Sequence, residues 1–295
     1  MDRRNQMQVR LLIIRLVWRL LIGAACFFSS AAMIYAEDAA EEHVKIMLIS
    51  EQQAIVPGQE FQLGVRFDLQ EGWHTYWVNP GDAGEAARIT WELPPGFQAG
   101  PIQWPYPARL PTPPFVDYGY AGRVLLAVAV RAPSGLGAGG NEKIVTDVHY
   151  LICREVCIPG RKQLALTLPV RDQTAEGSEA PLFVTARQQL PRPIPSGWRI
   201  SASSVGDEFQ LRLRAGKLAG PPQFFPLEPE QIENAAPQKI TPIPGGVELH
   251  LKKSNHLLKP ISRIKGVMVV SETAYLLDLP VSESARGTHT QFMKN

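Results

Sequence analysis

Apolar and polar residues alternate along most of the chain with a period of two. The pattern is clear in His43–Ile49 and in Phe61–Phe67, two runs separated by the turn-forming pair Pro57-Gly58. Such alternation is typical of β-strands that bury one face. Further strand-like runs, each bounded by Gly or Pro, are Arg88–Leu93, Arg123–Val130, Lys143–Ile152 and Gln163–Leu168. Their spacing predicts an antiparallel β-sandwich and argues against a fold that alternates strands with helices.

The alternation breaks at residues 170–197 and then resumes. Ser178 is placed to cap a short helix from Glu179 to Leu190, and the prolines from Pro191 to Pro195 stiffen the exit. Strand patterning returns from Trp198 through Phe209–Arg214, Gly246–Lys252, Gly266–Val270 and Tyr275–Leu279. We therefore expect an all-β protein with two immunoglobulin-like β-sandwich domains, at residues 37–170 and 198–283. A linker at 171–197 joins them, and a polar tail follows at 284–295.

Composition supports a folded protein built of short segments. The 295 residues include 45% hydrophobic residues, 26 prolines and 24 glycines, which favours strands and turns over long helices. With 30 basic and 28 acidic residues, the chain is neither a disordered polyelectrolyte nor a protein with the basic footprint of nucleic-acid binding.

The N-terminus has the features of an export signal. Five arginines precede the apolar run Leu20–Tyr35, and Ala36 follows at a suitable cleavage position. We expect residues 1–36 to be a cleaved signal peptide; the alternative is an uncleaved N-terminal membrane anchor, for which the run is short of the ~20 residues a span needs. Cleavage predicts a periplasmic protein that retains two cysteines.

Those cysteines, Cys153 and Cys157, are candidates for a disulfide. In a continuous strand their Cα atoms would be about 13 Å apart, whereas a disulfide needs roughly 4.4–6.8 Å. The pair can form only if Arg154–Val156 is the loop of a tight hairpin. Because so small a loop stabilises the fold only modestly, a redox role is favoured. A structural staple, or a copper or zinc thiolate site that includes His149, is the alternative.

Two aromatic stretches accompany the cysteines. His74, Tyr76 and Trp77 precede a Pro-Gly turn, and the Pro- and Gly-rich stretch Pro111–Gly122 reads as a loop. Core packing is the ordinary role of such rings, and a lone histidine is more often a hydrogen-bonded polar residue than a ligand or base. At least one ring of the second stretch is expected to be exposed, where it could cover a disulfide. The residues of this expected shielding loop are Phe115, Asp117, Tyr118 and Tyr120.

The three stretches together resemble the N-terminal periplasmic domain of the DsbD family. The resemblance rests on GWHTYWVNPGDAG at residues 72–84, the Asp-Tyr-Gly-Tyr segment at 117–120 and the Cys-Arg-Glu-Val-Cys-Ile-Pro hairpin at 153–159. The short cysteine spacing is closer to the suppressor-of-copper-sensitivity B branch than to the classical members. Phe224-Phe225-Pro226 and the segment 266–270 also resemble the second immunoglobulin-like domain of that branch.

The resemblance implies a function in thiol–disulfide interchange. Family members pass electrons from a membrane-embedded domain to the N-terminal domain, which reduces periplasmic thioredoxin-fold proteins, including disulfide isomerases and cytochrome-maturation proteins. Carried over to this chain, Cys157 meets the substrate and Cys153 resolves the mixed disulfide. His74, Tyr76 and Trp77 support the pair. No cofactor or metal is implied, and copper handling or partner binding with a structural disulfide is the alternative function.

This sequence contains neither the membrane domain nor the thioredoxin-like domain of the family, and it has no Cys-x-x-Cys motif. We therefore expect electrons to arrive from a separate, membrane-embedded DsbD-like donor. The chain would then be one component of a protein-disulfide reductase rather than the whole enzyme.

Overall fold

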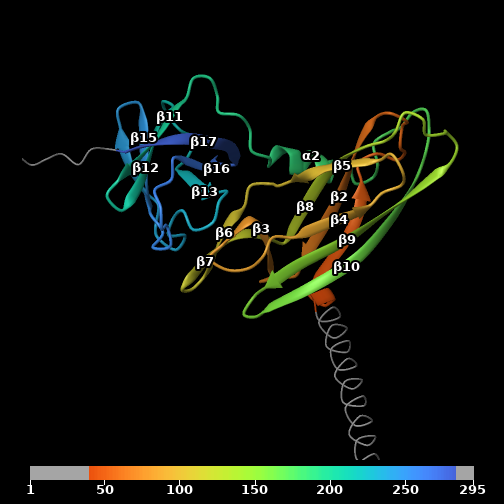
Figure 1. Cartoon of the computed structure of the whole chain (residues 1–295), viewed down its shortest axis with the longest axis horizontal. Helices are drawn as coiled ribbons and strands as arrows, with labels where there is room; N and C mark the ends of the chain where they lie inside the picture. Colours follow the sequence, from red (N-terminus) through yellow and green to blue (C-terminus); the bar gives the residue numbers. More distant parts are fainter. Residues whose placement is uncertain (1–39, 284–295) are drawn as a thin grey trace, which may run out of the picture.

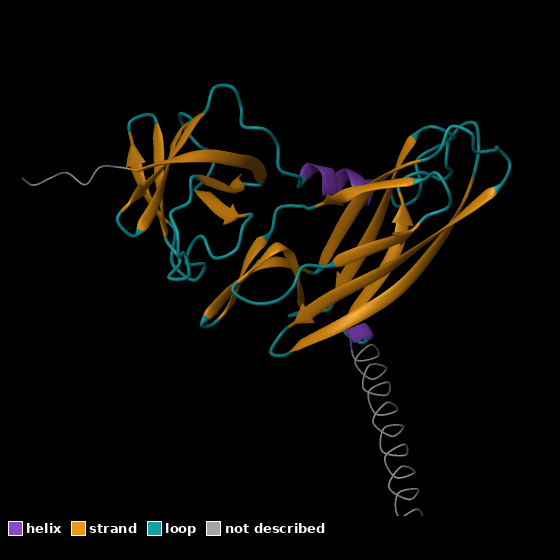
Figure 2. Cartoon of the chain, in the orientation of Figure 1, coloured by secondary structure: helices purple, strands orange, loops and turns teal. Residues whose placement is uncertain are grey.

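The computed structural model describes residues 40–283, and strands make up most of it (Figure 2). The expected signal peptide at 1–36 and the tail at 284–295 lie outside these residues. Within 40–283, no helix combines the length and the apolar character that crossing a membrane requires. The predicted all-β, immunoglobulin-like class is confirmed.

Two antiparallel sheets pack face to face in the N-terminal half, which we call the N-terminal sandwich (Figure 1). One sheet has the strand order β1 (Val44–Ser50), β2 (Glu60–Leu69), β8 (Arg123–Arg131) and β5 (Gln98–Gln103). The other has the order β10 (Cys157–Pro169), β9 (Asn141–Cys153), β3 (His74–Gly81), β7 (Phe115–Ala121) and β6 (Ala108–Thr112), with β4 (Arg88–Glu92) paired to β9.

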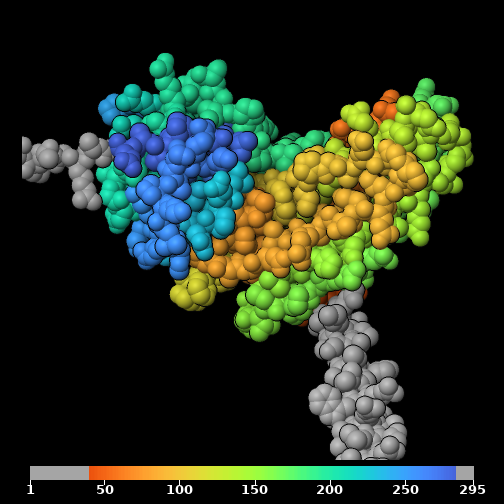
Figure 3. Space-filling model, viewed as in Figure 1, coloured from red at the N-terminus to blue at the C-terminus, as the bar shows by residue number. Residues whose placement is uncertain are grey.

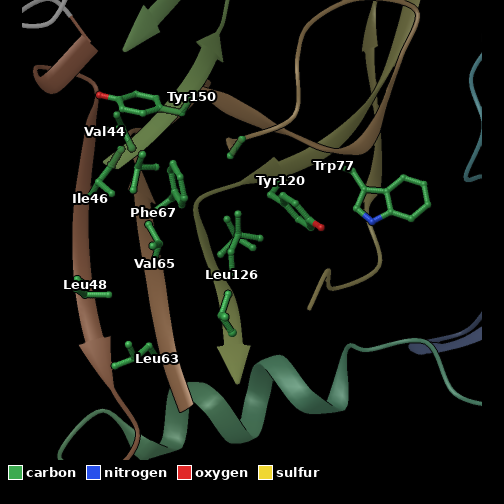
Figure 4. Packing of buried hydrophobic residues seen from close by; sticks show 14 of the residues in the cluster. Val44, Ile46, Leu48, Leu63, Val65, Phe67, Trp77, Tyr120, Leu126 and Tyr150 are labelled. Carbon is green, nitrogen blue, oxygen red and sulfur yellow. The ribbon is translucent and has the colours of Figure 1, made fainter. Parts of the chain in front are cut away.

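The core of this sandwich follows the period-two pattern of the sequence. Figure 4 shows the inward-facing residues of two neighbouring strands, Val44, Ile46 and Leu48 on β1 and Leu63, Val65 and Phe67 on β2. All six are buried and belong to one hydrophobic cluster. A one-residue slip between these strands would turn the whole set outward, so the apolar pattern fixes the register.

One helix, α2 (Ala180–Gln188), covers the outer face of the β1–β2–β8–β5 sheet. Phe183 and Ala186 pack there, and Gly64 leaves the space that Phe183 occupies, since a Cβ at Gly64 would lie 3.2 Å from its ring. The expected cap at Ser178 is wrong: the residue before the helix is Glu179, and its side chain makes no capping hydrogen bond.

The C-terminal half forms a seven-stranded arrangement, which we call the C-terminal sheet. Its strand order is β13 (Pro222–Pro226), β16 (Arg263–Val270), β17 (Thr273–Glu283), β11 (Arg199–Val205), β12 (Glu208–Arg214), β15 (Gly246–Lys252) and β14 (Lys239–Ile243). The strand β17 pairs with β16 up to Pro280 and with β11 from Val281 onward, so it changes partner along its length. An apolar core lies between the strands β13, β16 and β17 on one side and the strands β11, β12, β15 and β14 on the other.

The second aromatic stretch belongs to a hairpin of two strands rather than to a loop, and the first forms a strand. Residues 74–81 form β3 in the middle of its sheet, and residues 108–121 form the hairpin β6–β7. The loop was predicted because the second stretch is rich in proline. Pro111 lies in β6, the last strand of the sheet, where a missing N–H leaves no central pairing unmade.

Candidate functional site: an asymmetric disulfide at a hairpin tip

The two cysteines face each other across the base of the tight turn that joins β9 to β10. β9 ends at Cys153, β10 begins at Cys157, and the two residues are paired in register. They form a disulfide with a Cα–Cα distance of 4.1 Å. The connecting residues Arg154–Val156 make the tight turn that the spacing requires, and Arg154 N–H donates to the Val156 carbonyl at 3.2 Å.

The two sulfur-bearing residues differ in exposure. Cys153 is only 3% exposed, whereas Cys157 is exposed and follows Val156, an apolar residue that is 64% exposed. An approaching partner therefore meets Cys157 first. Thiol–disulfide exchange requires access to the sulfur that is attacked, so the fold makes one sulfur of the pair reachable and protects the other.

Tyr76 contacts the protected sulfur. Its hydroxyl donates a hydrogen bond to Cys153 Sγ at 2.7 Å and lies 3.7 Å from Cys157 Sγ. The pairing of His74 with Cys153 places β3 beside the disulfide, and Tyr76 lies two residues further on the same face. Burial, and then the nearby Asp117 carboxylate, raise the pKa of Tyr76, so the phenol stays protonated and remains a donor.

A glycine turn lies against the Tyr76 ring. Gly84, with a φ of +90°, comes so close that a Cβ there would lie 2.1 Å from ring atom Cε1. Only glycine combines this backbone conformation with that approach. The turn from Gly81 to Gly84 therefore buries one side of the tyrosine that contacts sulfur.

His74 and Asp117 form a second buried pair beside Tyr76. Asp117 Oδ2 lies 3.9 Å from His74 Nε2, and the carboxylate also accepts hydrogen bonds from Thr112 Oγ1 and the Ala83 N–H, both at 3.0 Å. Burial raises the pKa of Asp117, while these hydrogen bonds and His74 oppose the rise. Burial lowers the pKa of His74, against the attraction of Asp117. His74 Nε2 has no hydrogen-bond partner, so this histidine is not the satisfied polar residue that the sequence suggested.

The other predicted site residues are more dispersed. Trp77 is buried in the core, Tyr118 donates to Asn234 Oδ1 at 2.8 Å, and Tyr120 donates to the Pro105 carbonyl at 2.6 Å. Tyr118 and Tyr120 are thus packed inside the protein, which corrects the expectation that they belong to an external loop. Phe115 is 51% exposed at the tip of the β6–β7 hairpin. Shielding of the disulfide by Phe115 stays a prediction.

The cysteines are not part of a metal-binding cluster in the described structure. Among residues 40–283, no group of three or more His, Cys, Asp or Glu side chains is arranged to hold a metal ion. His149, four residues before Cys153, lies on β9 with Nε2 3.7 Å from Asp147 Oδ1. Its ring therefore neighbours a carboxylate rather than the sulfurs.

Sequence reasoning missed the residues that hold the glycine turn, above all Asp82 and Asn234. Gly81 and Gly84 flank Asp82-Ala83, and this spacing signals a tight turn that could have been found. Nothing near Asn234 in the sequence points to the disulfide, because its relation to the site is made only by the fold.

The comparisons with known proteins agree with this geometry. Residues 46–169 match the family model described as thiol:disulfide interchange protein DsbD, N-terminal. This part of the chain is a DsbD-family N-terminal domain. Its family supports a role in thiol–disulfide interchange, and the Cys153–Cys157 pair fits a redox disulfide. A search of curated proteins found no match.

One solved structure shares the fold over most of the chain. The N-terminal periplasmic domain of ScsB from Proteus mirabilis matches with a TM-score of 0.62 at 14% identity, over 82% of this chain and 94% of that chain. At this identity the likeness concerns the fold alone. The periplasmic chaperone SfaE (TM-score 0.20, 12% identity, 80% and 100% covered) and the pilin BcpA of Bacillus cereus (0.26, 10%, 81% and 69%) score too low to indicate a shared fold.

Proposed function

We propose that this protein is a periplasmic thiol–disulfide interchange module. It relays electrons from a membrane-embedded, DsbD-like donor to periplasmic thioredoxin-fold proteins through the Cys153–Cys157 pair. One observation carries the proposal: the disulfide joins an exposed sulfur to a buried sulfur that accepts a hydrogen bond from Tyr76 at 2.7 Å. The DsbD N-terminal family match and the periplasmic domain named in the ScsB structure support it.

The asymmetry assigns a role to each sulfur in the incoming step. A donor thiolate attacks Cys157 Sγ and forms a new S–S bond with its own electron pair. The Cys153–Cys157 bond breaks, and Cys153 leaves as a thiolate that keeps the electrons of that bond. The Tyr76 hydroxyl donates to this sulfur, so it stabilises the negative charge that develops there.

The remaining steps release the donor in its oxidised form and then pass the electrons to an acceptor. The donor's second thiolate attacks the donor's first sulfur, which is bonded to Cys157 in the mixed disulfide, and Cys157 leaves as a thiolate. The chain has then gained two electrons, with two protons from solvent, and the donor is oxidised. In the outgoing direction Cys157 attacks an acceptor disulfide, and Cys153 attacks Cys157 Sγ to release the reduced acceptor.

Charge around the exchange sulfur is balanced. Arg154 Nη2 lies 3.5 Å from Glu155 Oε1 in the turn between the cysteines, and both side chains are well exposed. A solvent-exposed pair of opposite charges contributes little stabilising energy, so neither Arg154 nor Glu155 by itself determines how readily Cys157 becomes a thiolate. Reactivity at Cys157 therefore depends on access, while the environment of Cys153 determines how readily the disulfide opens.

Trapping of mixed disulfides tests the assignment. Cys153→Ser leaves Cys157 able to attack a partner but unable to be released, so it should accumulate adducts with periplasmic thioredoxin-fold proteins. Cys157→Ser leaves only the buried Cys153 and should form none. Adducts are resolved on non-reducing gels and identified by mass spectrometry, beside a thermal melt of each variant.

The alternatives give different outcomes in the same experiment. A structural staple predicts no adducts from either variant and equal destabilisation of both. Closing a five-residue loop should contribute only about 2 kcal/mol, so a larger, equal loss of stability in both variants, without adducts, refutes the relay. Copper bound near one equivalent by the reduced protein, and lost in both variants, supports the copper-handling alternative instead.

A further inference from the structure

An asparagine of the C-terminal half reaches into the N-terminal sandwich beside the redox site. Asn234, between β13 and β14, is 6% exposed. Its Nδ2 donates to Asp82 Oδ1 at 2.8 Å, and its Oδ1 accepts from the Tyr118 hydroxyl at 2.8 Å. Its backbone carbonyl accepts from Arg109 Nη2. All three partners belong to the N-terminal sandwich.

Asp82 is part of the glycine turn that lies against Tyr76. Its second carboxylate oxygen accepts from the Val116 N–H at 2.8 Å, so the same side chain ties the turn both to β7 and to Asn234. Gly81 and Gly84 have φ values of +93° and +90°. Residues 82–84 are exposed, and Ala83 is the only apolar side chain among them. Hydrogen bonds, rather than apolar burial, therefore hold the turn in place.

Other contacts hold the C-terminal sheet against this region. Strand β3 bulges between Tyr76 and Gly81, and within the bulge Asn79 Nδ2 donates to the Pro226 carbonyl at 2.8 Å. The Phe225 ring packs edge-on against Tyr118 at 5.3 Å and belongs to the core cluster of the N-terminal sandwich. Figure 3 shows the C-terminal sheet (cyan and blue) directly against the orange surface of the N-terminal sandwich. The bulge and the interface together give Asn234 a fixed position.

We propose that Asn234 is a positioning residue for disulfide exchange. It holds the Gly81–Gly84 turn through Asp82, the turn holds the Tyr76 ring, and the Tyr76 hydroxyl stabilises the Cys153 sulfur as it leaves. The C-terminal sheet thus contributes to the reactivity of a disulfide that it does not contain. This inference rests on the proposed function, because it concerns the rate of the exchange step.

The test is a double-mutant cycle on the full chain between Asn234→Ala and Tyr76→Phe. The measured quantity is the rate at which reduced bacterial thioredoxin, used as the probe dithiol, reduces the Cys153–Cys157 disulfide. Losing one hydrogen bond to a carboxylate should slow wild-type reduction by about three- to tenfold. In the Tyr76→Phe background, the same change should slow it by less than about twofold, because the two residues act through one contact.

Gln238→Ala is the matched control. Gln238 makes two side-chain hydrogen bonds to the backbone of Phe224, both inside the C-terminal sheet, and none of them reaches the N-terminal sandwich. It should lower the stability of the C-terminal sheet without slowing exchange. If Asn234→Ala unfolds, Asp82→Ala replaces it in the cycle, since it removes the other partner of the same hydrogen bond from an exposed turn.

The outcomes separate this inference from the proposed function. Equal slowing by Asn234→Ala in both backgrounds, or no more slowing than Gln238→Ala gives, overturns the positioning role while Tyr76→Phe still slows exchange. If thioredoxin fails to reduce the wild-type disulfide and Tyr76→Phe changes nothing, the interchange function fails as well. Slowing by Asn234→Ala in the wild-type background, but not in the Tyr76→Phe background, supports the positioning role.

Discussion

The N-terminal sandwich and the C-terminal sheet use the same kind of strand but differ in what their buried polar side chains contact. The hydrophobic cluster of the C-terminal sheet is built from apolar residues such as Leu249 and Leu277, which are fully buried. Both halves bury polar side chains as well: His74, Asn79 and Asp117 in the N-terminal sandwich, and Gln231, Asn234 and Glu248 in the C-terminal half. Buried polar groups cost free energy unless they are paired, and groups with such a cost often have a functional role.

The location of these groups supports this interpretation. His74 and Asp117 lie beside Tyr76, whose hydroxyl contacts the disulfide, and Asn79 holds the C-terminal sheet. The N-terminal sandwich therefore spends some stability on chemistry. In the C-terminal half, Glu248 pairs with Arg212 and Gln231 with Glu228, both within that half, while Asn234 contributes a polar side chain at the interface. Each prediction below tests this division of roles.

The largest expected effect is on stability, in the C-terminal sheet. Leu249→Ala should lower the free energy of unfolding by about 2–5 kcal/mol, because it empties part of a fully buried core. Denaturant unfolding measures this loss. The rate of disulfide reduction, measured without denaturant where the variant is still folded, should stay within about twofold of wild type. A parallel collapse of the reduction rate would show that the core of the C-terminal sheet acts on the site beyond the Asn234 contact.

The next effect is on rate, in the N-terminal sandwich. Tyr76→Phe removes the hydrogen bond to Cys153 Sγ and should slow reduction by about 10- to 100-fold, as expected for a hydrogen bond to a charged sulfur. Stopped-flow reduction by a thioredoxin-fold dithiol measures it. Thr146→Val is the matched control, since it removes one buried hydroxyl of β9, which donates to the Thr90 carbonyl at 2.9 Å, without touching sulfur. Equal slowing by both variants would remove Tyr76 from the mechanism.

The smallest effect is a pH dependence of stability that comes from His74. Burial lowers the pKa of His74 in the folded protein, so on acidification the unfolded chain takes up the proton first. Stability should therefore fall as the pH drops through about 6.5, by less than about 1.4 kcal/mol per pH unit for a single proton. The raised pKa of Asp117 has the opposite effect at lower pH. Its contribution to the free energy of unfolding is present below about pH 3.8 and is lost as the pH rises from there.

His74→Gln isolates that dependence. Unfolding free energies at pH 7.5 and 5.5 should differ less in this variant than in wild type, because the group that titrates between them is gone. An unchanged difference would mean that another group is responsible for the pH dependence.

Much of this structure follows from local patterns in the sequence. The period-two runs predicted the strands on the two sides of the core, and the geometry of four-residue spacing predicted the hairpin that joins Cys153 to Cys157. The same local patterns failed where tertiary position decided the outcome. Pro111 reads as a loop residue unless it is known to lie on an edge strand.

The candidate site was predictable in part. Resemblance marked Tyr76 as a supporting residue, but its contact with the buried sulfur depends on how β3 lies between β9 and β7. Asn234 comes within reach of Asp82 only through contacts between residues 152 positions apart. No periodicity or spacing carries such information, because it arises from packing of one half of the chain on the other.

The reduction potential of the Cys153–Cys157 disulfide tests the central claim most directly. The wild-type protein is equilibrated in glutathione buffers of known potential, and the oxidised fraction is measured by mass after thiol alkylation. A working interchange disulfide should titrate at a potential less negative than about −300 mV, within reach of thioredoxin-fold partners. A midpoint more negative than about −300 mV would identify a structural staple and contradict the relay.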